Sequence, residues 1–147
     1  MTTPKLQLQS VSKAFDDKPV LRDVDLVVAP HEGVCLIGSS GSGKSTMLKC
    51  VNLLVPIDEG AILLDGADIT AAGVNANQVR EALGIVLQAF NLVPHMTVLD
   101  NNTRSPRKVQ GVRKRQAEDK ARELLEGFGL SDKVDEYPDR LSGGEQQ

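Results

Sequence analysis

One stretch of the chain has the residue types and spacing to bind phosphate, Gly38-Ser39-Ser40-Gly41-Ser42-Gly43-Lys44-Ser45-Thr46. It matches the pattern G-x-x-x-x-G-K-[ST] at every fixed position. Glycines let the main chain wrap around an anion without Cβ clashes, and the N–H groups of such a loop direct partial positive charge toward it. In this pattern Lys44 reaches the β- and γ-phosphates of a nucleotide, and the Ser45 hydroxyl holds Mg²⁺.

The flanking segments are those that a phosphate loop needs. Val34-Cys35-Leu36-Ile37 is apolar and predicts a buried strand that leads into the loop. Residues 46 to about 54 predict a helix that leaves it, with its buried face formed by apolar residues at helical spacing: Met47, Leu48, Val51 and Leu54. The alternative is a Gly/Ser-rich turn with a chance lysine, but composition alone seldom gives strand, loop, Lys-Ser and helix in this order.

The composition is that of a soluble globular domain. The chain has 147 residues, of which 40% are hydrophobic and 25% charged, and its net charge is −3. The negative charge argues against nucleic acid as the main partner, and 3% aromatic residues without tryptophan argue against a base-stacking surface. We expect a cytosolic protein, because the sequence has neither a membrane-spanning apolar run nor the apolar core of a signal peptide. Cys35 and Cys50 lack a CxxC spacing and are interpreted as packing residues.

Residues before Gln88 predict short strands around the phosphate loop. Two β-rich stretches, 6–11 and 20–28, are separated by a turn at 16–19, and residues 60–70 predict a hairpin around Asp65-Gly66. Val79 to Leu83 predicts a short helix, and Gly84 to Leu87 a short buried strand that ends at Gln88.

Residues after Gln88 predict helices. Thr97 is placed to cap a helix, and Arg113 to Gly127 predicts an amphipathic helix with one apolar face, formed by Ala117, Ala121, Leu124 and Leu125. Ser142 and the two glycines after it are suited to open a helix and offer donors to an anion. We therefore divide the chain into a nucleotide-binding core of mixed β and α/β structure, residues 1–88, and a helical lobe, residues 89–147.

The phosphate loop, Gln88 and the stretch Leu141-Ser142-Gly143-Gly144-Glu145-Gln146-Gln147 together resemble the nucleotide-binding domain of ABC transporters. The resemblance runs along the whole chain. Around Leu48–Leu54 and Gln88–Val98 it is strongest to the ATPases of polar amino-acid importers. It implies an α/β P-loop NTPase fold with an antiparallel β subdomain, a partial parallel-sheet core and a helical subdomain. The chain would be C-terminally truncated, because it ends at the signature motif.

The resemblance also implies roles for single residues. Phe15 takes the place of an aromatic that stacks on adenine, and Gly38 to Thr46 that of the Walker A loop. Gln88 takes the place of the Q-loop glutamine, which senses Mg²⁺ and the γ-phosphate, so Ser45 and Gln88 are the candidate metal contacts. The signature residues are Leu141, Ser142, Gly143, Gly144 and Glu145. They would contact the γ-phosphate of ATP held by the opposite subunit.

Partners follow from the same resemblance. Two ATP molecules would lie between two such domains, in a homodimer or with a paired ATPase subunit. Closing and reopening of the pair would act on transmembrane permease subunits at the inner face of the plasma membrane. In the family a Mg²⁺-binding Asp, a catalytic Glu and a switch His follow the signature motif, and none occurs in these 147 residues. We therefore expect this chain to bind ATP and hardly hydrolyse it, with incomplete cover for its apolar core.

Three functions remain open at this point. The first is the N-terminal part of the ATP-hydrolysing subunit of an importer, indicated by the order of Phe15, the phosphate loop, Gln88 and the signature motif along the chain. The second is a nucleotide-binding or interaction module without turnover. The third, an ABC-type ATPase of DNA repair or translation, is weaker because the sequence has no long coiled coil and no duplicated cassette.

Overall fold

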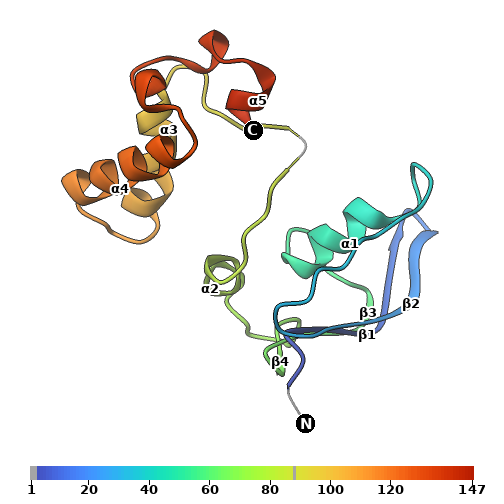
Figure 1. Ribbon diagram of the computed structural model, residues 1–147. Coiled ribbons are helices and arrows are strands. Elements are labelled where there is room, and N and C mark those ends of the chain that lie inside the picture. Colours follow the sequence, from blue (N-terminus) through green and yellow to red (C-terminus); the bar gives the residue numbers. More distant parts are fainter. Residues whose placement is uncertain (1–2, 88) are drawn as a thin grey trace. The chain divides into compact units, whose positions relative to one another are not determined.

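The computed structural model describes residues 3–87 and 89–147. The chain forms two compact units, Met1–Ile85 and Val86–Gln147 (Figure 1). Gln88, the predicted Q-loop glutamine, lies outside the described residues. The functional roles assigned above to residues 1–88 and 89–147 stay a prediction.

The first unit is built on an antiparallel sheet in the order β2-β1-β3-β4. Its strands are β1 (Leu6–Phe15), β2 (Lys18–Val28), β3 (Glu59–Leu64) and β4 (Ala67–Asp68). β1 is central, since Leu8 pairs with Leu26 on one side and with Ile62 on the other. This sheet is the antiparallel β subdomain that the sequence predicts.

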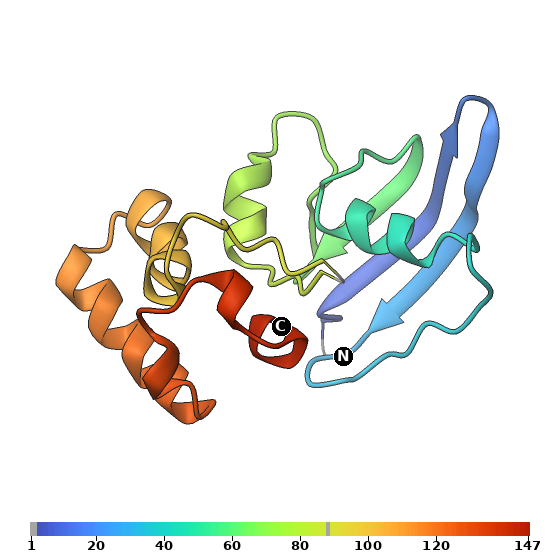
Figure 2. The same ribbon diagram turned by 90° about the horizontal axis from the view of Figure 1, so that it is seen from above.

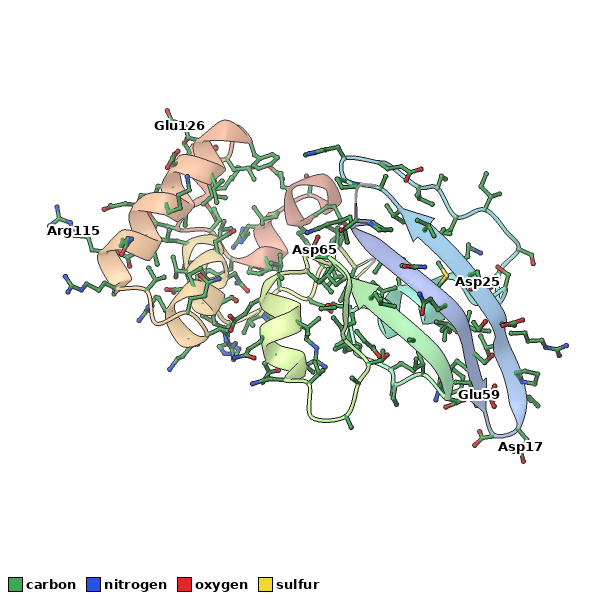
Figure 3. The ribbon with its side chains drawn as sticks, turned by 90° about the horizontal axis from the view of Figure 1, so that it is seen from below. Asp17, Asp25, Glu59, Asp65, Arg115 and Glu126 are labelled. Atoms are coloured by element: carbon green, nitrogen blue, oxygen red, sulfur yellow. The ribbon has the colours of Figure 1, made fainter. Side chains whose placement is uncertain are left out.

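Both hairpins of this sheet turn through residues with positive φ. Asp16 and Asp17 (φ 46° and 61°) join β1 to β2, and Figure 3 labels Asp17 at that turn. Asp65 and Gly66 (φ 51° and 81°) join β3 to β4, so the predicted hairpin is confirmed. Two successive left-handed residues give a turn whose twist matches that of the flanking strands, and Asp and Gly tolerate this conformation best.

Helix α1 (Lys44–Val51) supplies the other half of this core, packing against the sheet (Figure 2). The buried side chains of this core are Leu8, Val11, Leu21, Met47, Cys50, Ile62 and Ile69. The predicted helix face was wrong in part, because Leu48 and Leu54 are exposed. The helix starts at Lys44 and ends at Val51, so Leu54 lies beyond it, and Met47 with Cys50 forms the contact face.

The two predicted core strands are absent. Residues 34–37 and 84–87 have no regular secondary structure, and Cys35, predicted to be buried, is exposed. Ile37 is 91% exposed and Val86 82%. The physical reason is pairing: a parallel core strand is stable between neighbouring strands with helices on both faces, and neither segment enters the four-stranded antiparallel sheet of the described residues. The fold is α/β, but the expected partial parallel sheet is not formed there.

A short helix, α2 (Ala76–Glu81), holds the end of α1. It starts three residues before the predicted Val79, because the Asn75 side chain accepts hydrogen bonds from two main-chain N–H groups of its first turn. Arg80 donates from Nε to the Asn52 carbonyl (3.2 Å) and from Nη2 to the Leu53 carbonyl (2.6 Å). The guanidinium thereby satisfies carbonyls that the end of α1 leaves free.

The second unit contains α3 (Val98–Lys108), α4 (Lys114–Gly127), two 3-10 turns (Ser131–Lys133 and Pro138–Arg140) and α5 (Gly143–Gln146). Its core is formed by Val98, Leu99, Ala121, Leu125, Val134 and Leu141. The Thr97 cap is confirmed, since its hydroxyl accepts from the Asp100 N–H at 3.2 Å. Leu124 was wrongly placed on the buried face of α4 and is exposed. No helix in the described part of the chain is long and apolar enough to cross a membrane.

Candidate phosphate-binding site

The phosphate loop, residues 38–46, runs into the N-terminus of α1. Gly41 and Gly43 have φ of 81° and 91°, a left-handed backbone that side chains with Cβ adopt at a cost. A turn closes the loop, as the Ser42 N–H donates to the Ser39 carbonyl at 3.2 Å. The loop therefore bends twice before Lys44 opens the helix, and it does so at glycines.

Gly43 lies in close contact with β2. A Cβ at this position would lie 2.9 Å from the Val20 carbonyl oxygen and 3.1 Å from Cδ2 of Leu21. Gly43 is buried and is the N-cap residue of α1, and its carbonyl accepts from the Met47 N–H at 2.8 Å. The strand, the loop and the helix thus meet at a residue that has no room for a side chain.

Lys44 folds back over the loop. Its ammonium donates to the carbonyls of Gly38 (2.9 Å) and Ser39 (2.7 Å) and to the Ser42 hydroxyl (3.1 Å), which uses its three donors. All three acceptors are neutral. Among the described residues no carboxylate lies within ion-pair distance of Lys44. The charge is therefore uncompensated, and an anion entering the loop would gain a charge-assisted hydrogen bond.

The N-terminus of α1 is open to a ligand. It has no side-chain cap and no acidic residue in its first turn. The first N–H groups of a helix lack carbonyl partners, and the helix dipole adds positive potential there. Ser45 is exposed and Thr46 half-buried in this turn. The described residues hold no cluster of three His, Cys, Asp or Glu side chains suited to a metal. The hydroxyl of Ser45 stands at the motif position that would contact Mg²⁺.

Phe15 is the last residue of β1 and keeps 45% of its surface exposed. It pairs across the turn with Lys18, and β2 then leads to Val20 and Leu21, the residues that touch Gly43. The aromatic ring and the phosphate loop are thus tied to the same strand, within one unit.

The residues at 141–147 form a capped helical turn. Ser142 and Glu145 make a reciprocal capping box: the Ser142 N–H donates to Oε2 of Glu145 (2.7 Å), and the Glu145 N–H donates to the Ser142 hydroxyl (3.4 Å). Leu141 is buried, whereas Ser142, Gly143 and Gly144 are exposed. Hydrogen bonding from Ser142, by its side chain and then its N–H, holds the pKa of Glu145 below its ordinary value.

Two contacts at these places were not foreseen. Gln146 anchors the last turn, because Nε2 donates to the carbonyls of Pro138 (2.9 Å) and Leu141 (3.0 Å). Lys13, two residues before Phe15, lies over the ring with Nζ 5.4 Å from its centroid and is bonded to Asp58. Residues two apart along a strand lie on one face, so the sequence could have predicted that Lys13 lies near Phe15. It could not have predicted Asp58 as the partner of Lys13, because the two are 45 positions apart.

Comparison with known proteins shows which family and which relatives the chain resembles. The family described as ABC transporter matches residues 21–147. The chain is 43% identical over 142 residues to the glutamine transport ATP-binding protein GlnQ of Escherichia coli, covering 97% of this chain and 59% of the relative. It is 41% identical to the glutamate transport ATP-binding protein GluA of Corynebacterium efficiens, with the same coverage. It is 39% identical over 146 residues to the general L-amino acid transport ATP-binding protein AapP of Rhizobium johnstonii, covering 99% of this chain and 57% of the relative. The chain thus spans less than two thirds of these relatives.

Replacing Gly43 by alanine should destabilise the first unit more than replacing Gly41. Both have positive φ, which costs alanine about 1–2 kcal/mol, but nothing lies within 4 Å of a Cβ at Gly41. At Gly43 the clash with the Val20 carbonyl should add about 1–3 kcal/mol. Urea unfolding followed by far-UV circular dichroism measures both, since the chain has no tryptophan. Equal losses in the two variants would contradict the pinning of the loop on β2.

The capping box should weaken in acid. Because the folded-state pKa of Glu145 is lowered, its contribution is present above the ordinary Glu pKa of about 4.3 and is lost as the pH falls through the lowered value. NMR titration of the Glu145 carboxyl carbon measures this pKa. In Ser142→Ala, which keeps the main-chain N–H, the pKa should move part of the way back up toward the ordinary value; an unchanged titration would show that the Ser142 hydroxyl is not a cause.

Proposed function

The chain belongs to the ABC transporter family, and on that premise we propose that it forms the ATP-binding part of an importer subunit for polar amino acids. The observation that carries the proposal is Lys44, an uncompensated cation held by neutral acceptors of a glycine loop at an open helix N-terminus. The chain spans about 59% of the relatives it resembles, so transport as a whole belongs to the longer protein.

In the proposed complex, phosphate oxygens accept hydrogen bonds from the loop N–H groups and from Lys44. The ammonium exchanges the neutral Gly38 and Ser39 carbonyls for phosphate oxygens, and this exchange is favourable because the phosphate adds the Coulomb attraction of a negative charge that the carbonyls lack. The Ser45 hydroxyl holds Mg²⁺, which neutralises phosphate charge. Phe15 supplies a surface for adenine.

The signature residues are proposed to serve the ATP of a second subunit, in a homodimer or with a paired ATPase subunit. They are Leu141, Ser142, Gly143, Gly144 and Glu145. The support is local: the exposed glycines open α5, and the capping box with the buried Leu141 fixes the turn that presents them.

The importer assignment draws on what the relatives are named for. They are ATP-binding proteins of glutamine, glutamate and general L-amino acid transport. We infer that permease subunits at the inner face of the plasma membrane are the partners, that the protein is cytoplasmic and peripheral there, and that Gln88 links the site to them.

Lys44→Met should weaken binding of MgATP by about 10- to 100-fold, because hydrogen bonds to charged groups contribute about 1.5–3 kcal/mol. Lys49→Met is the matched control: it removes the same charge from an exposed position in the last turn of α1. Titration calorimetry with MgATP measures both. Equal affinities in the two variants would remove Lys44 from the site.

Phosphate release in the same samples separates the two main functions. Sustained release by wild type that Lys44→Met abolishes identifies a hydrolase, whereas binding without release favours the non-hydrolysing module.

A further inference from the structure

Asp58 holds the end of β1 through three contacts. Its carboxylate accepts from Lys13 Nζ (2.6 Å, Oδ1) and from the Ala14 N–H (2.7 Å, Oδ2). Its own N–H donates to the Ser12 carbonyl (2.9 Å). Asp58, which directly precedes β3, therefore fixes residues 12–14 of β1. The residue that follows them is Phe15. These bonds hold the pKa of Asp58 below its ordinary value, with the Lys13 side chain as the largest cause.

The Lys13–Asp58 pair differs from the other ion pair of this sheet. The Lys13 side chain is only 10% exposed and that of Asp58 44%, whereas in the pair between Lys5 and Asp65 the side chains are 52% and 63% exposed. Withdrawing an ammonium from water is costly, so a surface pair would serve stability as well or better. The partial burial of Lys13 therefore calls for a role beyond that of a surface ion pair.

The ammonium of Lys13 lies over Phe15. Its distance of 5.4 Å from the ring centroid is within the range of a cation–π interaction. Phe15 nevertheless keeps 45% of its surface exposed, which leaves room for a second flat group. A cation on one face draws π-electron density toward itself, so the opposite face becomes less repulsive to an electron-rich purine.

The position of the ring suits a nucleotide bound in the phosphate loop. Phe15 pairs with Lys18, and Val20, two residues farther along β2, touches Gly43. At ~3.3 Å per residue this is roughly 7 Å along the strand, a span that a ribose and its first phosphate bridge.

We propose that Lys13 and Asp58 are positioning residues for the base of a purine nucleotide. Lys13 backs the Phe15 ring and Asp58 fixes the main chain beneath it, so the ring offers a preset stacking face. This inference rests on the proposed function, because it presupposes a nucleotide in the phosphate loop. It adds a recognition element specific to the base.

The test compares MgATP with magnesium tripolyphosphate, which has the phosphates and no base, by titration calorimetry on the full chain. Lys13→Met should weaken MgATP binding by about 3- to 10-fold and leave tripolyphosphate within about twofold. Lys13→Arg keeps the cation and should bind MgATP within about twofold of wild type. Lys5→Met removes the same charge from the exposed pair at the residue just before the same strand, and it should change the binding of neither ligand.

A merely structural role predicts a different pattern. If Lys13→Met weakens both ligands equally, or weakens neither, the inference is overturned. Phe15→Leu leaves the Lys13–Asp58 pair in place and must show the same loss confined to MgATP, which keeps the test decisive should Lys13→Met fail to fold. If wild type binds neither ligand, or Lys44→Met binds both unchanged, the proposed function fails instead.

Discussion

The close approach of Gly43 to the main chain of β2 is the constraint on which the candidate site depends. Because no Cβ fits between Gly43 and the Val20 carbonyl, the loop, the start of α1 and the second strand occupy one fixed arrangement. The same strand continues back to the turn at Phe15. One glycine thus sets where the helix N-terminus lies with respect to the aromatic ring, and the side chains around it can be exchanged more freely than Gly43 itself.

Electrostatics follows from that arrangement. Lys44 donates to two carbonyls and a hydroxyl, neutral groups that a phosphate would displace, and α1 has no acidic residue in its first turn. Lys13, which lies over Phe15, is paired with Asp58 and so adds little net charge near the loop. We therefore propose separate tasks for the two lysines: Lys44 carries the charge that attracts an anion, and Lys13 orders an aromatic surface.

The sequence predicted those turns, loops and helix caps that depend on residues close together in the chain. The phosphate loop, the Asp65-Gly66 hairpin, the Thr97 cap and the Ser142 cap each depend on residues within a few positions of one another. Segments 34–37 and 84–87 were wrongly predicted as buried strands, because a strand forms only with partners, and the antiparallel sheet does not include them. The exposed Leu48 and Leu124 show the same limit at single positions: periodicity marks an apolar stripe, and packing decides how much of it is covered. Asp58, which acts on Lys13 from 45 positions away, could not be found without the fold.

Hydrogen exchange measured by mass spectrometry, with and without saturating MgATP, tests most directly that the main chain of residues 38–46 binds the triphosphate. Exchange should slow in the peptide that contains these residues and stay unchanged in the hairpin of residues 60–70. Unchanged exchange across residues 38–46, under conditions where calorimetry shows the nucleotide bound, would contradict it.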